Sequence, residues 1–360
     1  MPTRRDTFQG CTTRFTFSTG LVIALGWLMI GCDKVQLPQM EAPVAQPAPP
    51  GPAAAANQPV QPVPMVTPGP APAAPAQVDN AQAIAAFIKK SKTDRLNEFD
   101  LSEFAKVEGT AGLDEIHDLK LTAVMDTGLV HLSRFTNVTS LTLEGCTVTN
   151  AVGAVIQRLP ELRILNLNSN SVDDQVMAVI ASKPSIVELR LANTGLTDLG
   201  LNELEKLHDL EILDVSGTNI TGAGFERFRD HKKLRELYAN KCRQLQSEAF
   251  KFLAGCPLEV LEVNATAVTD PGMIFIGRLK KLQKLSIGEC GISDIGINKL
   301  VGMKDLEYID VHNLGAVSGA LFQKLAPCKN LKQVNVRGTG ISAADCIKFK
   351  KLHPECEIIR

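Results

Sequence analysis

Leucine and other apolar residues recur along most of the chain at a fixed interval. Each copy of the pattern has the form L-x-x-L-x-L, as in Leu162, Leu165 and Leu167. Successive copies are separated by 24 residues, except for one interval of 25 residues. A less regular copy precedes them. The copies begin at Ile116, Val138, Leu162, Ile186, Leu210, Leu234, Leu258, Leu282, Leu306 and Leu331. A repeat of this kind predicts a solenoid of stacked units.

Each repeat combines two periodicities. The alternating apolar residues of L-x-L predict a short strand with one buried face. A Thr-Asp or Ser-Asp pair then precedes apolar residues at helical spacing, as in Leu201, Leu204 and Leu207 after Thr197-Asp198. The aspartate immediately before such a face is expected to be the helix N-cap. One repeat is therefore predicted as strand, turn and helix, and several must stack to bury a core.

The full pattern, L-x-x-L-x-L-x-x-[TCN]-x-[VLI]-[TS]-D-x-G, resembles the short, helix-containing leucine-rich repeats of bacterial proteins, which are akin to the ribonuclease-inhibitor and F-box types. The resemblance covers residues 116–360 and implies an α/β solenoid with a parallel inner sheet of about ten strands and short outer helices. Two repeats depart from it, through an extra residue after Cys242 and through Leu314. Residues 356–358 are expected to form a short closing strand, which completes a C-terminal cap.

Residues 79–115 are predicted to cap the other end of the core. Ile84, Phe87 and Ile88 follow an Asp-Asn pair at the spacing of one helical face. An amphipathic helix in this place would cover the first repeat, whose apolar side has no preceding repeat against which to pack.

Residues 1–31 have the features of an export signal. Arg4, Arg5 and Arg14 form a basic region, and an apolar run follows at residues 21–30. The run ends in Ile30-Gly31-Cys32, which resembles the bacterial lipobox and implies that Cys32 is lipidated. The expected location is the extracytoplasmic, periplasmic side of a bacterial membrane. An uncleaved anchor helix is the alternative, although the run is short for a membrane span of about 20 residues.

Residues 32–78 are rich in proline and alanine. Thirteen of the twenty prolines of the chain fall between Pro38 and Pro75. Proline fixes φ and removes a backbone donor, and the segment has little bulky apolar surface. We expect a semi-rigid, extended linker between the membrane and the repeats. A ligand for a polyproline-binding domain is the alternative.

Composition and motifs argue against catalysis. The formal net charge is −1, which gives no electrostatic reason to expect nucleic acid as a partner. The six histidines show no H-E-x-x-H motif, and no G-x-S-x-G motif or P-loop occurs. The sequence therefore predicts no catalytic residue, no metal site and no cofactor.

A calcium site was considered for the aspartates that recur in the repeats. The series offers one carboxylate per repeat, whereas calcium takes six to eight oxygen ligands, so helix capping is favoured over calcium binding. Its members are Asp126, Asp174, Asp198, Asp270 and Asp294.

The cysteines are predicted to be small buried residues. Cys146, Cys242 and Cys290 share one repeat position, and Cys242 and Cys290 are two repeats apart. Two strand spacings are about 10 Å, which exceeds the separation that a disulfide spans. Only Cys346 and Cys356, near the C-terminus, remain as a possible pair.

The solvent-facing strand positions form the inner face of the predicted solenoid. Both tyrosines of the chain fall in this set, and exposed tyrosine is a common interface anchor. The predicted partner-binding residues are Glu236, Tyr238, Glu262, Lys284, Tyr308, Asp310 and His312. We expect this mildly acidic face to bind a protein or peptide that carries Arg or Lys. A structural cell-envelope component that binds wall polymer or self-associates is the alternative.

Overall fold

The computed structural model describes residues 80–108 and 112–360. The predicted signal sequence, Cys32 and the proline-rich linker lie outside the described residues, so the expectations for them remain predictions.

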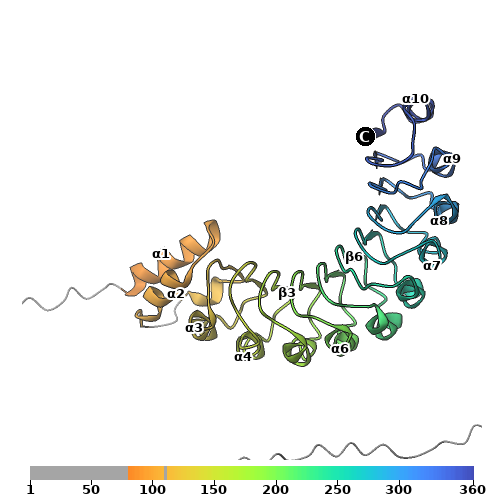
Figure 1. Cartoon of the computed structure of the whole chain (residues 1–360). Helices are drawn as coiled ribbons and strands as arrows, with labels where there is room; N and C mark the ends of the chain where they lie inside the picture. The colour runs from red at the N-terminus through yellow and green to blue at the C-terminus, as the bar shows by residue number, and fades with distance from the viewer. Residues whose placement is uncertain (1–79, 109–111) are drawn as a thin grey trace, which may run out of the picture. The chain divides into compact units, whose positions relative to one another are not determined.

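Eleven short strands form one parallel sheet in chain order (Figure 1). Residues at the same repeat position pair with each other, for example Leu165 with Leu189. The strands are β1 Asp118–Lys120, β2 Ser140–Thr142, β3 Ile164–Asn166, β4 Glu188–Arg190, β5 Ile212–Asp214, β6 Glu236–Tyr238, β7 Val260–Glu262, β8 Lys284–Ser286, β9 Tyr308–Asp310, β10 Gln333–Asn335 and β11 Glu357–Ile359. The predicted fold, a leucine-rich-repeat solenoid, is confirmed. β11 is the predicted closing strand, shifted by one residue.

The core follows the repeat. The middle residue of each strand from β1 to β10 is buried. The first and last apolar residues of each L-x-x-L-x-L copy are buried as well, so that Leu162, Leu165 and Leu167 are all fully inaccessible. One hydrophobic cluster runs from Ile84 to Cys356. Each repeat therefore supplies one layer, and neighbouring layers cover each other.

Short helices form the outer layer (Figure 1). The α-helices of the repeats are α3 Asp126–Leu129, α4 Val152–Gln157, α5 Met177–Ala181, α6 Asp198–Glu203, α7 Gly272–Ile276, α8 Asp294–Ile297, α9 Ala320–Leu325 and α10 Ala343–Leu352. The 3-10 helices are η1 Leu113–Glu115, η2 Val130–Arg134, η3 Asp174–Val176, η4 Leu204–Lys206, η5 Ala223–Asp230, η6 Ser247–Gly255 and η7 Asn298–Leu300. In two repeats, η5 and η6 stand in place of the predicted α-helix. Their N-cap residues, Gly222 and Gln246, make no side-chain hydrogen bond to the helix.

Among the described residues, two α-helices lie before η1 and the first strand: α1 Asn80–Thr93 and α2 Glu98–Ala105. Ile84 and Phe87 of α1 are buried in the same hydrophobic cluster as the repeats. The ring of Phe87 stacks on Phe104 at 4.1 Å and on Phe135 at 5.7 Å, measured between ring centroids. These aromatic contacts cover the apolar side of the first repeat.

The prediction that the aspartates are N-caps was wrong. The N-cap of α6 is Thr197, whose hydroxyl group accepts the backbone N–H of Leu199. Asp198 is the first helical residue, and its carboxylate reaches the next repeat. There it accepts the N–H and the hydroxyl group of Thr221, at 2.9 and 2.7 Å, and the N–H groups of Gly222 and Gly224, both at 3.0 Å. The acid therefore joins two repeats.

The same link recurs along the solenoid. Each of the other four aspartates accepts the N–H and the hydroxyl group of a residue one repeat later. The pairs are Asp126–Thr149, Asp174–Thr197, Asp270–Ser293 and Asp294–Ser318. Glu98 of α2 makes the equivalent contacts with Met125 N–H at 2.8 Å and the Thr127 hydroxyl group at 2.5 Å. The N-terminal helices thus join the series.

All seven cysteines in the described part of the chain are free. Cys346 and Cys356 are buried in the hydrophobic cluster and do not pair, so the possible disulfide is absent. Cys242 lies where it was predicted, with its Sγ 3.1 Å from the carbonyl oxygen of Val215.

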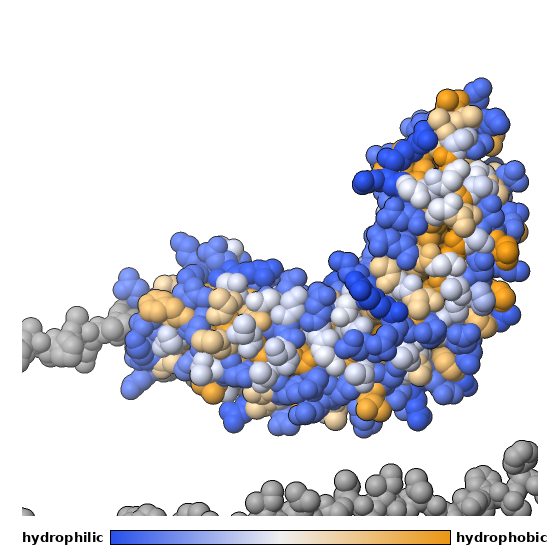
Figure 2. Space-filling view, in the orientation of Figure 1, coloured by the Kyte–Doolittle hydropathy of each residue, from blue (hydrophilic) through white to orange (hydrophobic). Residues whose placement is uncertain are grey.

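Hydrophilic residues dominate the face seen in Figure 2, with hydrophobic residues between them. The large exposed hydrophobic residues include Phe99, Leu199 and Ile295. Within residues 80–108 and 112–360, no helix has the length and apolar character needed to cross a membrane.

Candidate functional site on the concave face

The sheet lines the concave side of the solenoid, and the helices lie on the convex side (Figure 1). Because side chains alternate along a strand, the first and third residues of each strand face the concave side while the middle residue enters the core. In strands β2 to β7 these outward residues are half-buried, so their side chains lie close to one another.

The first residues of strands β3 to β9 alternate between apolar or aromatic and charged side chains. In strand order they are Ile164, Glu188, Ile212, Glu236, Val260, Lys284 and Tyr308. We call Ile164, Ile212 and Val260 the apolar row. All three are half-buried, with a charged residue on the strand between each pair. Neighbouring strands are about 4.8 Å apart, so residues of the apolar row recur about every 9.6 Å.

Tyr238 lies in a cluster that spans three strands. Its hydroxyl group donates to Oε2 of Glu236 at 2.7 Å. The guanidinium carbon of Arg190, two strands away, is 5.9 Å from the centre of the tyrosine ring. Arg190 Nε is also 2.6 Å from Oε1 of Glu188. Burial, together with the hydrogen bond to Glu236 and its charge, raises the pKa of Tyr238, so its hydroxyl group stays protonated.

Tyr308 has a similar arrangement. Lys284 Nζ lies 5.2 Å from the centre of its ring and 2.7 Å from Oε1 of Glu262. Burial and the nearby charges of Asp310 and Glu262 raise the pKa of Tyr308. Both tyrosines are therefore held beside a cation that is itself paired with a carboxylate. The sequence had led us to expect that both tyrosine side chains project freely into solvent, and neither of them does.

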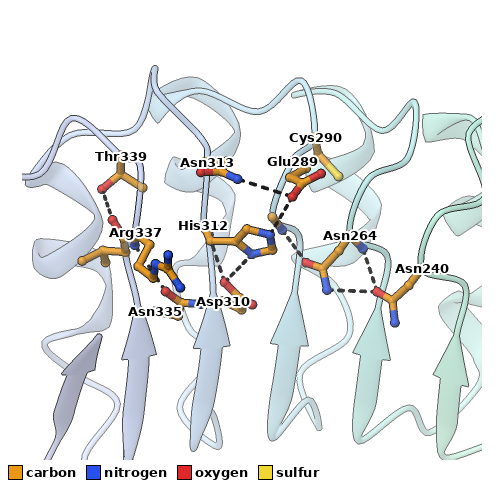
Figure 3. A network of polar contacts seen from close by, with 12 residues as sticks. Asn240, Asn264, Glu289, Cys290, Asp310, His312, Asn313, Asn335, Arg337 and Thr339 are labelled. Carbon is orange, nitrogen blue, oxygen red and sulfur yellow. Dashed lines mark hydrogen bonds and ion pairs between the residues drawn. The ribbon is translucent and has the colours of Figure 1, made fainter. Parts of the chain in front are cut away.

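Asp310 and His312 lie at the end of the same strand (Figure 3). Asp310 is 8% exposed and therefore buried, although the sequence analysis placed it among the solvent-facing residues. His312 Nδ1 is 2.9 Å from Oδ1 of Asp310, and its Nε2 is 3.2 Å from Oε1 of Glu289. The ring lies over Gly288, where a Cβ atom would come within 2.1 Å of Nδ1. Only glycine leaves room for the ring there.

An amide series joins the strands just beyond their ends (Figure 3). Oδ1 of Asn240 accepts the backbone N–H of Asn264 at 2.9 Å, and Oδ1 of Asn264 accepts that of Gly288 at 2.6 Å. Asn240 Nδ2 also donates to Oε2 of Glu262 at 2.9 Å. These bonds fix the backbone beside the two tyrosines.

The seven predicted partner-binding residues all lie on β6 to β9 or just after β9, but they form two groups. Glu236 belongs with Tyr238, whereas Glu262 and Lys284 lie with Tyr308, Asp310 and His312. The sequence analysis missed Glu188, Arg190 and Glu289. Alignment of the repeats by strand position would have placed Glu188 and Arg190 on the same face.

No metal site is found in the part of the chain that the structure describes: no three His, Cys, Asp or Glu side chains are placed to hold an ion. The concave face instead offers aromatic rings, paired charges and half-buried aliphatic side chains. That chemistry suits recognition of a polypeptide.

No family model and no curated protein matches the chain. Several solved structures are similar to it. A leucine-rich-repeat protein of Leptospira interrogans is 18% identical over 74% of this chain and 76% of its own, with a TM-score of 0.49. An internalin of Listeria monocytogenes is 15% identical over 78% of this chain and 93% of its own, with a TM-score of 0.41. The yeast Rad7–Elc1 complex contributes a chain 17% identical over 78% of this one and 83% of its own, with a TM-score of 0.45. At such identities the fold assignment rests on this chain's own repeat and strand register.

Proposed function

We propose that this protein is a membrane-anchored scaffold on the extracytoplasmic side of a bacterial membrane, and that the concave face of its repeats binds a protein or peptide. One observation carries the proposal. Both tyrosines of the chain lie on that face, half-buried, each beside a cation and a carboxylate. Tyrosines held in this way lose little side-chain freedom on binding, and tyrosine is frequent among the residues that dominate binding energy.

The charge of the face favours a basic partner. The outward strand residues of β4 to β9 include five carboxylates and two cations. The cations, Arg190 and Lys284, pair with Glu188 and Glu262. Asp214 and Glu236 form no ion pair among the described side chains. An incoming Lys or Arg would complement these two carboxylates, and such complementarity speeds association and selects the partner.

The membrane anchor is proposed from the N-terminal sequence. Basic residues and an apolar run precede Ile30-Gly31-Cys32, and proline-rich residues follow. Replacement of the proposed acceptor, Cys32→Ala, should abolish labelling by palmitate and leave the precursor unprocessed. Cys11→Ala is the matched control, because Cys11 would be removed with the signal. Normal labelling of Cys32→Ala would disprove the anchor without touching the binding proposal.

Capture of a partner tests the binding proposal. The mature chain serves as bait in an envelope fraction of the native organism, beside a variant with both Tyr238→Ala and Tyr308→Ala. We expect a protein that wild type captures and the double variant does not. Arg227→Ala is the control, because Arg227 lies in η5 on the convex side, where it pairs with Glu205 at 3.7 Å. Equal capture by wild type and double variant would overturn the proposal.

A further inference from the structure

Three consecutive repeats carry unpaired cations on their outer surface. These repeats contain η6, α7 and α8, whose helices follow one another along the convex side (Figure 1). Residues 247–255, 272–281 and 294–304 include six cations but only two carboxylates, those of Glu248 and Asp294. The carboxylate of Asp294 already accepts two hydrogen bonds from the following repeat. We call the six cations the basic patch, and all of them are exposed, with no ion pair to any described side chain. They are Lys251, Arg278, Lys280, Lys281, Lys299 and Lys304.

Apolar side chains are exposed on the same helices. Ile274 of α7 is 44% exposed, Ile295 of α8 is 69% exposed, and Val301, directly after η7, is 58% exposed. Phe252 of η6 and Phe275 of α7 are half-buried. Figure 2 shows hydrophobic residues on the outer edge of this part of the molecule. Apolar surface that is rimmed by polar residues is typical of a contact with a protein or a membrane.

Two cations of the basic patch lie against aromatic rings instead of carboxylates. Lys251 Nζ is 4.6 Å from the centre of the Phe252 ring, and the guanidinium carbon of Arg278 is 5.7 Å from the centre of the Phe275 ring. A neutral ring attracts a cation through its quadrupole but does not cancel the charge. The positive charge of the patch therefore remains available to an anion.

We propose that the convex surface of these three repeats docks on the anionic surface of a lipid bilayer. The basic patch would contact the phosphate groups of the lipids, while Ile274, Ile295 and Val301 would enter the headgroup region. The inference rests on the proposed function, which places the chain on a membrane, and it adds the surface of the solenoid that the bilayer contacts.

The chemistry of the surface favours a bilayer over an acidic protein. Amphipathic helices that bind at a membrane interface combine Lys and Arg with apolar side chains buried about 5–10 Å into the headgroup boundary. Each Lys or Arg near an anionic membrane surface strengthens binding about fivefold. The proposed lipid anchor would also keep the bilayer at a high local concentration, so a weak contact is sufficient.

Docking through the convex side is compatible with binding on the concave side. The helices and the sheet lie on opposite sides of the solenoid (Figure 1). A bilayer beneath α7 and α8 would therefore leave Tyr238 and Tyr308 accessible to a partner.

A fluorescent probe tests which surface meets the bilayer. A polarity-sensitive dye is attached to Ile295→Cys in the full chain, on vesicles of two parts phosphatidylcholine to one part phosphatidylglycerol. The seven cysteines of the described residues should not react, because burial raises the pKa of each thiol. The unsubstituted chain gives any remaining background. The matched control is Gln175→Cys, an exposed residue at the same repeat position five repeats earlier.

We expect the emission of the dye at Ile295 to shift to shorter wavelength and to be quenched by a quencher attached to the lipid. The response should be smaller on phosphatidylcholine alone and absent at Gln175. Added salt should weaken it, because salt screens exposed charges. No response at Ile295, or equal responses at both positions, would overturn the proposal.

Removal of charge provides the second test. Lys251→Gln combined with Lys299→Gln removes two cations that make no hydrogen bond to any described side chain. The ratio of docked to undocked dye at Ile295 should fall about 25-fold, which is about fivefold for each cation. Lys89→Gln combined with Lys206→Gln, at exposed lysines outside the basic patch, should equal the unsubstituted chain. Docking of the first pair as strong as that of the control pair would contradict the inference.

Polyglutamate, added without vesicles, tests the other class of partner. A response of the dye at Ile295 that equals or exceeds the response to anionic vesicles would assign the surface to an acidic protein and reject the bilayer. Failure of docking and failure of the proposed function are distinguishable. A silent dye in a chain that takes up palmitate and captures its partner rejects docking alone. A chain that takes up no palmitate and captures its partner without the tyrosines rejects the proposed function, whereas a dye response on added vesicles would still support docking.

Discussion

The carboxylate of Asp198 accepts two hydrogen bonds from Thr221, a residue 23 positions further along the chain. One bond comes from the backbone and one from the hydroxyl group. Thr221 lies just before η5 of the next repeat, so the contact fixes one repeat on its neighbour. In a solenoid, stability depends on such nearest-neighbour interfaces. The aspartate that recurs at this position therefore stabilises the stacking of neighbouring repeats.

Removal of this carboxylate should destabilise the fold. Asp198→Ala leaves the N–H groups of Gly222 and Gly224 without their acceptor, and the expected loss is about 1–3 kcal/mol of unfolding free energy. Chemical denaturation measures it. Asp305→Ala, at an exposed aspartate, is the control and should not change the transition. A loss no larger than that of the control would contradict the role given to Asp198.

The same group predicts a response to acid. Burial acts to raise the pKa of Asp198, but the hydrogen bonds from Thr221, Gly222 and Gly224 outweigh burial and lower it. Because the pKa of Asp198 is lower in the folded chain than in the unfolded chain, its carboxylate stabilises the fold fully at pH values above the unfolded pKa of about 3.9. This stabilisation is lost as the pH falls through the pKa of the folded chain. The stability difference between wild type and Asp198→Ala should therefore shrink below about pH 4. A difference independent of pH would be inconsistent with this account.

His231 predicts a second pH effect, nearer neutrality. Its ring is buried against Phe228 at 4.3 Å, and Nδ1 has no hydrogen-bond partner. Burial lowers its pKa, with the charge of His208 adding to the effect. The unfolded chain takes up a proton near pH 6.5 and the folded chain does not, so stability should fall as pH drops through about 6.5. Melting curves of His231→Phe should lack this loss, whereas His117→Gln, at an exposed histidine, should retain it.

The core assignment predicts unequal costs for adjacent residues. Leu213 is fully buried, whereas Ile212 faces the concave side and is half-buried. Leu213→Ala should cost about 2–5 kcal/mol, the usual range for truncation of a buried leucine. Ile212→Ala should cost less than half as much, because it leaves no cavity inside the solenoid. Equal losses in denaturant titrations would show that the register of β5 is wrong.

The cysteines should be unreactive in the folded protein. Burial raises the pKa of both Cys256 and Cys328 to about 11, and the thiolate is the reactive form. Iodoacetamide should therefore leave both residues unmodified in the native chain and label them after denaturation. Peptide mapping without reduction should show Cys346 and Cys356 as separate peptides. A linked peptide would contradict the free thiols.

The repeat allowed most of the fold to be predicted. A fixed 24-residue interval places Leu141, Leu165 and Leu189 at equivalent positions, and their pairing in adjacent strands follows from that interval. The N-terminal helix could be predicted because Ile84 and Phe87 share a face. The helix types of the outer layer were harder to predict. The 3-10 geometry of η5 and η6 depends on local capping and packing, which the apolar spacing does not encode.

Contacts between repeats could not be predicted from one repeat. Asp198 precedes a helical face, which is also the position of an N-cap, and only the stacking shows that its carboxylate reaches Thr221 instead. The surroundings of Tyr238 were missed for the same reason, since Arg190 is 48 residues earlier in the sequence. The stack places these two residues on strands separated by one other.

The most direct test of the concave-face proposal is the affinity of the captured partner for single tyrosine variants. Isothermal titration should show that Tyr238→Ala and Tyr308→Ala each weaken binding by about 2 kcal/mol or more, as expected for residues that dominate an interface. Their melting temperatures should stay close to wild type, and Arg227→Ala should bind normally. If both tyrosine variants bind like wild type while Arg227→Ala binds weakly, the partner contacts the outer helices and the concave-face account is wrong.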